Sequence, residues 1–201
     1  MNQLIEKPDD IYANIVSNLK KGVKDRRHGF HTPVFSNINE KGLLNSRVVV
    51  LRQFDSNKMR INFHSDLRSN KINGLKLNSK TNFLFYDQKI KIQLRIATDS
   101  KIYCNNDIAK QAWNKASLSS RKCYLTEDAP GTIKTSATDG LPKHLTDIEP
   151  SRDESEKGYA NFSVVSNQIQ SIDWLYLSAS GHRRLLIKIN GNQNNYKWLI
   201  P

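Results

Sequence analysis

The sequence predicts a mainly β domain, with a core of roughly six to eight strands and short peripheral helices. Period-two alternation of apolar and polar residues recurs along the chain, most clearly where Ile92, Leu94 and Ile96 alternate with polar neighbours. Helical spacing is confined to shorter stretches between such segments. The 201 residues suffice for one domain with a sizeable core, so we expect residues 1–201 to form a single domain.

The segments that we expect to be strands are rich in β-branched and aromatic residues or alternate with a period of two, and turn residues bound them. An Asn-Glu-Lys-Gly turn at 39–42 joins the first two as a hairpin, and an Asn-rich turn at 190–195 precedes the last. The predicted strands are residues 31–39, 47–52, 61–65, 82–86, 90–97, 161–165, 172–178, 184–189 and 196–200.

The second predicted strand is a β-branched run bracketed by arginines, Arg47 and Arg52. This pattern is typical of a buried strand with cationic ends. Alternation places the two arginines on opposite faces, Arg52 together with Val48 and Val50.

Three helices are predicted, and the shortest of them follows the strand at 61–65 and carries Ile72, Leu75 and Leu77. Pro-Asp-Asp at 8–10 marks a helix start with Asp at or near the cap, and apolar residues recur at helical spacing up to Leu19, so we expect this helix to end around 20–22. Residues 107–116 have an N-cap and helical character. Residues 126–157 are polar and rich in Thr, Ser, Pro and Gly; because so long a stretch without secondary structure is uncommon in a compact domain, we expect a mobile loop.

The junction between the strand at 61–65 and a following short helix carries Arg68, Ser69 and Lys71. Unpaired N–H groups and the positive end of the helix dipole favour an anion at such a junction, and these side chains add charge-assisted donors. A capped helix with a solvated basic first turn is the alternative, since Ser is common at helix starts.

The net charge of +12 suggests either binding to nucleic acid or the holding of a phosphorylated ligand. No nucleic-acid-binding motif stands out and the charges are spread along the chain, so we expect nucleic acid not to be the partner. Cys104 and Cys123 have no spacing typical of a disulfide framework or a metal site. No apolar run is long enough to span a membrane and the first residues do not resemble a secretory signal, so the expected location is the cytoplasm.

The order of these motifs resembles the pyridoxamine 5′-phosphate oxidase family, in its oxidase-related branch rather than the vitamin B6 enzyme itself. The resemblance covers residues 34–115 and the C-terminal strands. It implies an FMN-binding split β-barrel, working as a homodimer with FMN at the interface. The similar segments are R-V-V-V-L-R, F-H-S-D-L-R-S-N-K, F-L-F-Y-D, Q-L-R-I, W-L-Y-L-S-A-S-G-H-R-R and W-L-I-P.

The resemblance also implies a set of cofactor-binding residues. Gln93 would hydrogen-bond the flavin ring, and Trp174 and Arg184 would contact the flavin across the dimer interface. On local sequence alone each has a structural alternative: Gln93 would be a solvent-facing residue, Trp174 a core aromatic and Arg184 a surface residue of a strand. The full set is Arg47, Val48, Val50, Arg52, His64, Ser65, Arg68, Ser69, Lys71, Gln93, Trp174 and Arg184.

The residues that would grip a substrate phosphate are mostly missing. The family's tyrosine, arginine and serine match Ala112, Ala116 and Ser120, and its arginine-histidine motif retains only His182. We therefore expect an FMN-dependent oxidoreductase that acts on something other than pyridoxine phosphate. The alternatives are a non-catalytic flavin- or haem-binding module on the same barrel and a basic nucleic-acid-binding protein.

Overall fold

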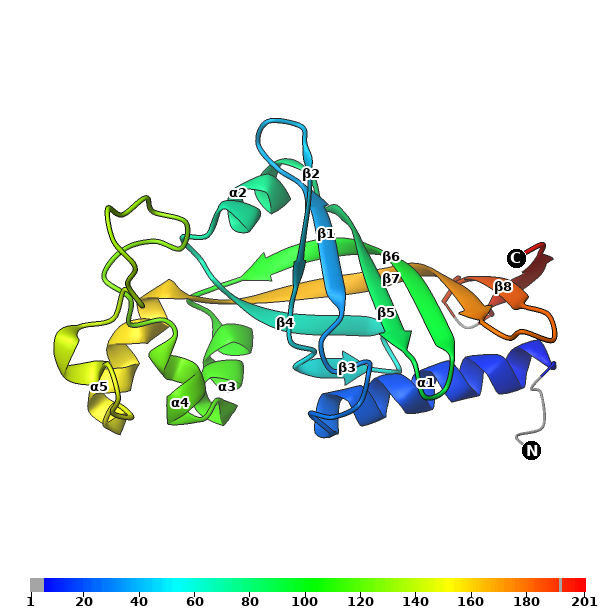
Figure 1. Ribbon diagram of the computed structural model, residues 1–201, viewed down its shortest axis with the longest axis horizontal. Helices are drawn as coiled ribbons and strands as arrows, with labels where there is room; N and C mark the ends of the chain where they lie inside the picture. The colour runs from blue at the N-terminus through cyan, green and yellow to red at the C-terminus, as the bar shows by residue number, and fades with distance from the viewer. Residues whose placement is uncertain (1–5, 192) are drawn as a thin grey trace.

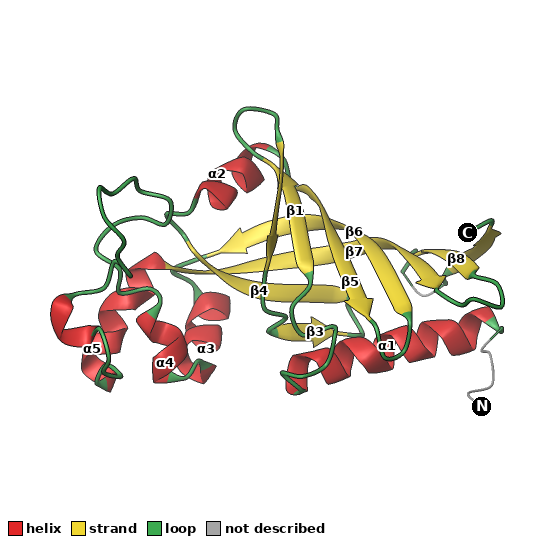
Figure 2. Cartoon of the chain, in the orientation of Figure 1, coloured by secondary structure: helices red, strands yellow, loops and turns green. Residues whose placement is uncertain are grey.

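The computed structural model describes residues 6–191 and 193–201, and they form one nine-stranded antiparallel sheet with a few helices (Figures 1 and 2). The described residues do not include 1–5 or 192. The prediction of a single domain covers all of these positions, and the predicted turn at 190–195 covers residue 192. The strands are β1 Val34–Ile38, β2 Leu44–Val48, β3 Gln53–Asp55, β4 Arg60–Asp66, β5 Lys80–Asp87, β6 Ile92–Tyr103, β7 Phe162–Tyr176, β8 Arg183–Lys188 and β9 Asn195–Leu199. The helices are α1 Pro8–Lys24, α2 Asn70–Leu77, α3 Asp107–Lys115, α4 Leu118–Lys122 and α5 Arg152–Glu156, with 3₁₀ turns η1 Lys143–Leu145 and η2 Lys157–Asn161.

The strand order is β2-β1-β5-β6-β7-β4-β3, and β8 and β9 extend the sheet from β7. The first part of β7 pairs with β4 and its last part with β8, while β6 runs alongside both parts. The long β6–β7 pair therefore spans the molecule, with helices α3, α4 and α5 gathered at one end and β8 at the other (Figure 1). The predicted mainly β split-barrel fold is confirmed, although the sheet of the single chain is not closed.

The main core fills the concave side of the sheet with aromatic residues. Phe35, Phe63 and Phe83 come from three strands and lie within 6.1 Å of one another, centroid to centroid. Helix α1 covers this side through Ile11, Ile15 and Leu19, which are almost fully buried. Burying such a side chain contributes about 1.5–3 kcal/mol, so this helix face is a large part of the core.

A second core lies under the helices at the other end of the sheet. Trp113 of α3 packs edge-on against Phe162 at the start of β7 and against Tyr124. The guanidinium of Arg121, only 2% exposed, lies over the Trp113 ring and forms an ion pair with Glu156. The helices are therefore fastened to β7 by an aromatic cluster and one buried cation.

The sequence prediction was wrong about the strand at 47–52. Strand β2 ends at Val48 and lies at an edge of the sheet, where it pairs only with β1. Its residues are exposed apart from Arg47, and Val48 is 62% exposed; only Leu51, beyond the strand, is buried. The β-branched run therefore spans the end of an edge strand and the residues after it, where Val48 faces outward and Val49 packs against the core.

Two strands were predicted where β7 is continuous. The intervening residues 166–171 look too polar for a strand interior, but residues 166–168 are paired with both β4 and β6, and the β6 pairing continues past a bulge at 169–171. Asn167 is fully buried and its Nδ2 donates to the Ile61 carbonyl at 2.9 Å. A buried amide with a partner carries the strand through the polar stretch.

The stretch at 126–157, which was expected to be a mobile loop without secondary structure, contains short helical elements. Its second half contains η1 and α5, and Ser155 is fully buried. The apolar anchor Leu145 and the ion pair of Glu156 with Arg121 hold this half against the rest of the chain. Such tertiary contacts do not show in the composition.

Smaller corrections concern helix ends and one strand. Helix α1 starts after Lys7 and continues to Lys24, because Gly22 lets the backbone of Phe30 pack where a Cβ would come within 2.9 Å. Helix α3 is capped by Asn106, whose side chain accepts from the Ala109 N–H. The short strand β3 was not predicted.

Candidate functional site

The junction of β4 and α2 forms a cradle of two hydroxyl groups and an ammonium group. Lys71 Nζ donates to Ser65 Oγ and Ser69 Oγ, each at 3.1 Å, and the two hydroxyls lie 3.2 Å apart. Ser65 and Ser69 are buried, and Ser69 is the N-cap of α2 although its side chain does not cap the helix. Its hydroxyl lies within hydrogen-bonding distance of the lysine instead, so a simple serine cap does not describe this helix start.

Arg47 adds a second cation beside this cradle. It lies on the core-facing side of β2, over the Phe35 ring, and its guanidinium donates to Asn37 Oδ1. Asn37 is buried, and its Nδ2 donates to the Ile38 carbonyl, so the amide is fixed with its oxygen toward the arginine. Sequence reasoning missed Asn37, although a polar residue at an inward position next to Phe35 was visible in the alternation.

The charges of Arg47 and Lys71 are only weakly compensated: the Asp66 carboxylate raises the pKa of Lys71, but burial and the Arg47 charge have the larger effect. Burial lowers the pKa of both groups, and the nearby Arg47 charge lowers the pKa of Lys71 further. Neither forms an ion pair within the described residues. Two partly desolvated like charges favour a bound anion, and a dianionic phosphate with several acceptor oxygens matches the donor set.

Arg68 is engaged elsewhere. Its Nε and Nη2 donate to the two oxygens of Asp66, and Nη1 and Nη2 donate to the carbonyl and hydroxyl of Thr126. The guanidinium therefore tethers the start of the 126–140 segment to the cradle turn. Asp66 also accepts from the Arg68 backbone N–H, and so it shapes the turn itself.

Arg52 and His64 lie apart from the cradle. His64 alternates with Phe63 and Ser65 along β4, and its ring packs edge-on against Phe162 on the other face of the sheet. Burial and the neighbouring charge of Arg52 lower the pKa of His64 to about 4. The imidazole is therefore neutral at neutral pH, and the Arg52 side chain is exposed.

Gln93 and Arg184 lie on the same, outer face of the sheet, with β7 between them. Gln93 pairs with Leu175 across β6–β7, and Leu175 pairs with Arg184 across β7–β8, so the three form one row. Trp174 points the opposite way, into the core, where its Nε1 has no hydrogen-bond partner. The two predicted flavin contacts Trp174 and Arg184 thus lie on opposite faces of this chain.

Val48 points outward from the edge strand and Val50 is half-buried just beyond it. Within one chain, the predicted cofactor residues therefore fall into separate groups. The cradle unites Arg47, Ser65, Ser69 and Lys71, whereas Arg52 with His64 and Gln93 with Arg184 lie elsewhere.

The predicted substrate side offers little for a phosphate. The Ser120 hydroxyl accepts from Ser117 Oγ, and His182 Nδ1 accepts from the Ser178 N–H in an exposed turn. Arg121, next to Ser120, is buried in its ion pair with Glu156. None of these side chains joins the cradle.

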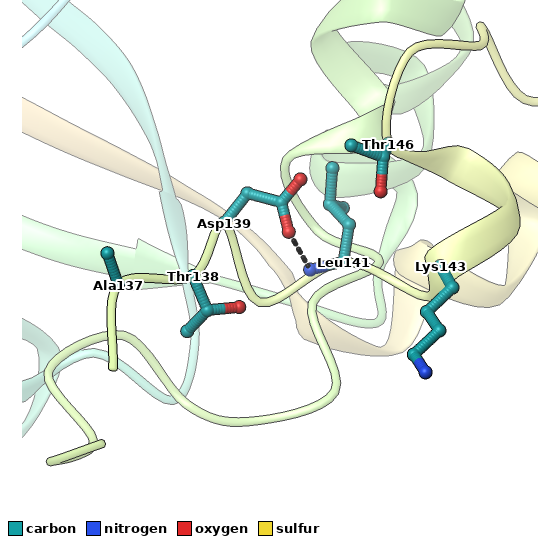
Figure 3. Close-up of a pocket in the computed structure, with 6 residues that line it drawn as sticks. All are labelled: Ala137, Thr138, Asp139, Leu141, Lys143 and Thr146. Atoms are coloured by element: carbon teal, nitrogen blue, oxygen red, sulfur yellow. Dashed lines mark hydrogen bonds between the residues drawn. The ribbon is translucent and has the colours of Figure 1, made fainter. Parts of the chain in front are cut away.

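Other candidate sites are weak in the part of the chain that the structure describes. No group of three or more His, Cys, Asp or Glu side chains there is placed to hold a metal ion, and both cysteines are free. An open depression is lined by Ala137, Thr138, Asp139, Leu141, Lys143 and Thr146 (Figure 3). Its one carboxylate, on Asp139, accepts from the Leu141 N–H at 3.0 Å, and the depression includes no residue of the cradle.

No helix in the described residues is both long enough and apolar enough to cross a bilayer.

The fold is a mainly β split barrel, with the cradle at a strand-to-helix junction. Residues 12–104 match the family model described as "Pyridoxamine 5'-phosphate oxidase, FMN-binding domain". Over these residues the chain matches the FMN-binding domain of the pyridoxamine 5′-phosphate oxidase-like family. No curated protein matches the sequence.

Solved structures support the same fold at low sequence identity. A pyridoxamine 5′-phosphate oxidase-related, FMN-binding protein from Nostoc punctiforme is 16% identical, with a TM-score of 0.76 over 98% of this chain and 100% of its own. PhzG from Burkholderia lata, solved with tetrahydrophenazine-1-carboxylic acid, is 15% identical, with a TM-score of 0.69 over 100% and 95%. A protein related to general stress protein 26 from Clostridium acetobutylicum is 10% identical, with a TM-score of 0.50 over 97% of each chain.

Proposed function

We propose that the protein binds FMN and serves as an oxidoreductase on a substrate other than pyridoxine phosphate. The observation that carries the proposal is the cradle, in which Arg47 and Lys71 flank two serine hydroxyls without a carboxylate partner. The FMN phosphate carries close to two negative charges and would be held by these four side chains. Two cations and two hydroxyls suit such a group better than a neutral ligand.

The outer face supports a cofactor site shared between two copies of the chain. Four apolar side chains project from this face: Leu44 and Val48 from β2, and Leu84 and Tyr86 from β5. Both strands pair with β1, and Leu44 is 75% exposed. Tyr86 is paired directly with Gln93, so this apolar area is continuous with the Gln93–Arg184 row. Contiguous exposed apolar area and an uncovered edge strand favour association. We propose a homodimer with FMN at this interface.

Bound FMN would supply the hydride or single-electron chemistry, so no side chain of the protein need be the catalyst. Arg47, Lys71 and the two serines would fix the phosphate end. Gln93 and Arg184 would donate N–H groups to the ring. His64 would act as a neutral hydrogen-bonding group, because its low pKa keeps it unprotonated at neutral pH.

The substrate side supports a departure from vitamin B6 chemistry. Ala112 and Ala116 carry no donor, and the one nearby arginine, Arg121, is buried and ion-paired. A dianionic substrate phosphate would therefore find neither the tyrosine nor the arginine at these positions of α3 and its C-terminal end. This side is open to a less highly charged substrate.

The loss of these substrate-phosphate residues also favours one competing function, a non-catalytic flavin- or haem-binding module. Both functions use the same barrel to hold the cofactor, so only catalytic turnover of the bound flavin distinguishes the enzyme from the binding module. Steady reduction of the bound flavin by NAD(P)H with reoxidation by oxygen or another acceptor would establish the enzyme. A bound flavin that stays oxidised under these conditions would favour the non-catalytic binding module.

The decisive experiment is an FMN titration followed by desalting and an absorption spectrum. We expect about one flavin retained per chain. Lys71→Ala should weaken binding at least tenfold, because it removes the ammonium group that contacts both hydroxyls. The matched control is Lys76→Ala on the same helix, which removes an exposed lysine and should leave binding unchanged. Wild-type protein that retains no flavin would refute the proposal.

A further inference from the structure

The outer face contains a partly buried carboxylate that forms ion pairs with two arginines. Asp173 of β7 is flanked by Arg95 of β6 and Arg184 of β8, and its side chain is 15% exposed. Arg184 Nε donates to Asp173 Oδ1 at 3.0 Å and Arg184 Nη2 donates to Oδ2 at 2.9 Å. Arg95 Nη2 also donates to Oδ2. One carboxylate thus receives three N–H groups from two strands.

The strand register explains how this arrangement faces Gln93. Arg95 pairs with Asp173, and Asp173 pairs with Leu186, in a row next to the Gln93–Leu175–Arg184 row. Both rows project to the outer face, since residues two apart in a strand share a face. Arg184 reaches diagonally to Asp173, and its Nη1 forms no hydrogen bond within the described residues. That nitrogen is left to bind a ligand.

The carboxylate is charged in this setting. Partial burial alone would raise the pKa of Asp173, but the hydrogen bonds from Arg184 and Arg95 outweigh burial and lower it. The bidentate contact fixes both the position and the plane of the Arg184 guanidinium. Without Asp173, the long Arg184 side chain would be free to change rotamer on the outer face of β8.

We propose that Asp173 is a positioning residue for the cofactor site: it orients Arg184 toward the flavin ring, and Arg95 holds Asp173 from the other side. The inference rests on the proposed FMN binding and deepens it, because it names a carboxylate that the site needs although it touches no part of the cofactor. The trio carries one net positive charge beside Gln93.

The sign of the effect of Asp173→Asn separates positioning from simple electrostatics. By charge alone, removing a carboxylate near an anionic cofactor would strengthen binding. Positioning predicts the opposite, because asparagine cannot accept two charge-assisted N–H bonds from Arg184. We expect Asp173→Asn to weaken FMN binding about fivefold to tenfold, and Arg184→Gln about tenfold.

The test is a double-mutant cycle measured by FMN titration. If Asp173 acts through Arg184, the double variant should bind no more weakly than Arg184→Gln alone. The matched control is Lys188→Gln, which removes an exposed cation from the same face of β8 and should have no effect. Arg95→Gln, which leaves the bidentate contact intact, should weaken binding only about twofold.

Unfolding curves of the apo variants, together with the visible band of bound flavin, show whether each variant is folded and whether the ring environment has changed. Multiplicative losses in the cycle, or Asp173→Asn binding as tightly as or more tightly than wild type, would overturn the inference. Wild-type protein without FMN affinity would instead overturn the proposed function, so the two failures are distinguishable.

Discussion

Replacing Gly74 with alanine should loosen the cradle from the strand that supports it. A Cβ at this position would lie 2.5 Å from the Ile38 carbonyl oxygen and 2.8 Å from Asn37 Nδ2. The carbonyl is backbone and Asn37 is fixed by its contact with Arg47, so neither can give way cheaply. Helix α2 must therefore move away from β1.

The magnitude follows from two opposing terms. Alanine gains about 1 kcal/mol over glycine in a helix interior, whereas overpacking of this kind costs about 1–3 kcal/mol. We expect the clash to dominate, with a net loss of roughly 1 kcal/mol in the free energy of unfolding. Because α2 carries Lys71 and β1 carries the partner of Arg47, FMN affinity should fall as well.

Chemical denaturation and FMN titration of Gly74→Ala, with Lys76→Ala as the control on the same helix, check this reasoning. A Gly74→Ala protein that is more stable than wild type would show that helix propensity wins and that α2 packs less tightly than the structure indicates. Lost stability with unchanged FMN affinity would show that the cradle does not depend on this contact.

Three further predictions follow from the contacts described above. Arg68→Ala should speed proteolysis of the 126–140 segment while weakening FMN binding less than Lys71→Ala, because its guanidinium is engaged by Asp66 and Thr126; equal losses of affinity would contradict this. Glu156→Gln leaves the buried charge of Arg121 without its partner and should cost about 1–3 kcal/mol of unfolding free energy, less than for a fully buried pair because Glu156 is partly exposed; an unchanged denaturation midpoint would refute it. The pKa of His64 is lowered to about 4 in the folded state, so the unfolded chain binds the proton more readily and stability should fall, by up to about 3 kcal/mol, between pH 6.5 and pH 4. In His64→Phe most of that pH dependence, measured by denaturation at several pH values, should disappear.

Local patterns predicted the elements better than their lengths and surroundings. The strand at 61–65, the helix that follows it and the hairpin around 39–42 are where alternation and turn chemistry place them. The continuity of β7 and the folding of 143–161 were missed, because both depend on partners about a hundred or about thirty-five residues away, such as the Ile61 carbonyl and Arg121. No window of sequence contains such contacts.

The candidate site divides in the same way. Ser65, Ser69 and Lys71 are close in sequence, and the structure brings their side chains together as the junction predicted, while the binding of an anion there stays a prediction. The residues that hold the cations, Asn37 and Asp173, were missed because each acts through a neighbouring strand. Motifs identify the groups that touch a ligand more readily than those that orient them.

The pairing of β4 with the first part of β7 has a consequence for how the chain folds. Ser163 Oγ donates to the Ser65 carbonyl across 98 residues of sequence, and Asn167 reaches Ile61 across 106. Contacts of such long range make folding slow, because a long loop must close before they form. During synthesis, one edge of β4 stays unpaired until about the last fifth of the chain, which begins with β7, has been made. A nascent chain that stops before β7 should therefore depend on chaperones or aggregate.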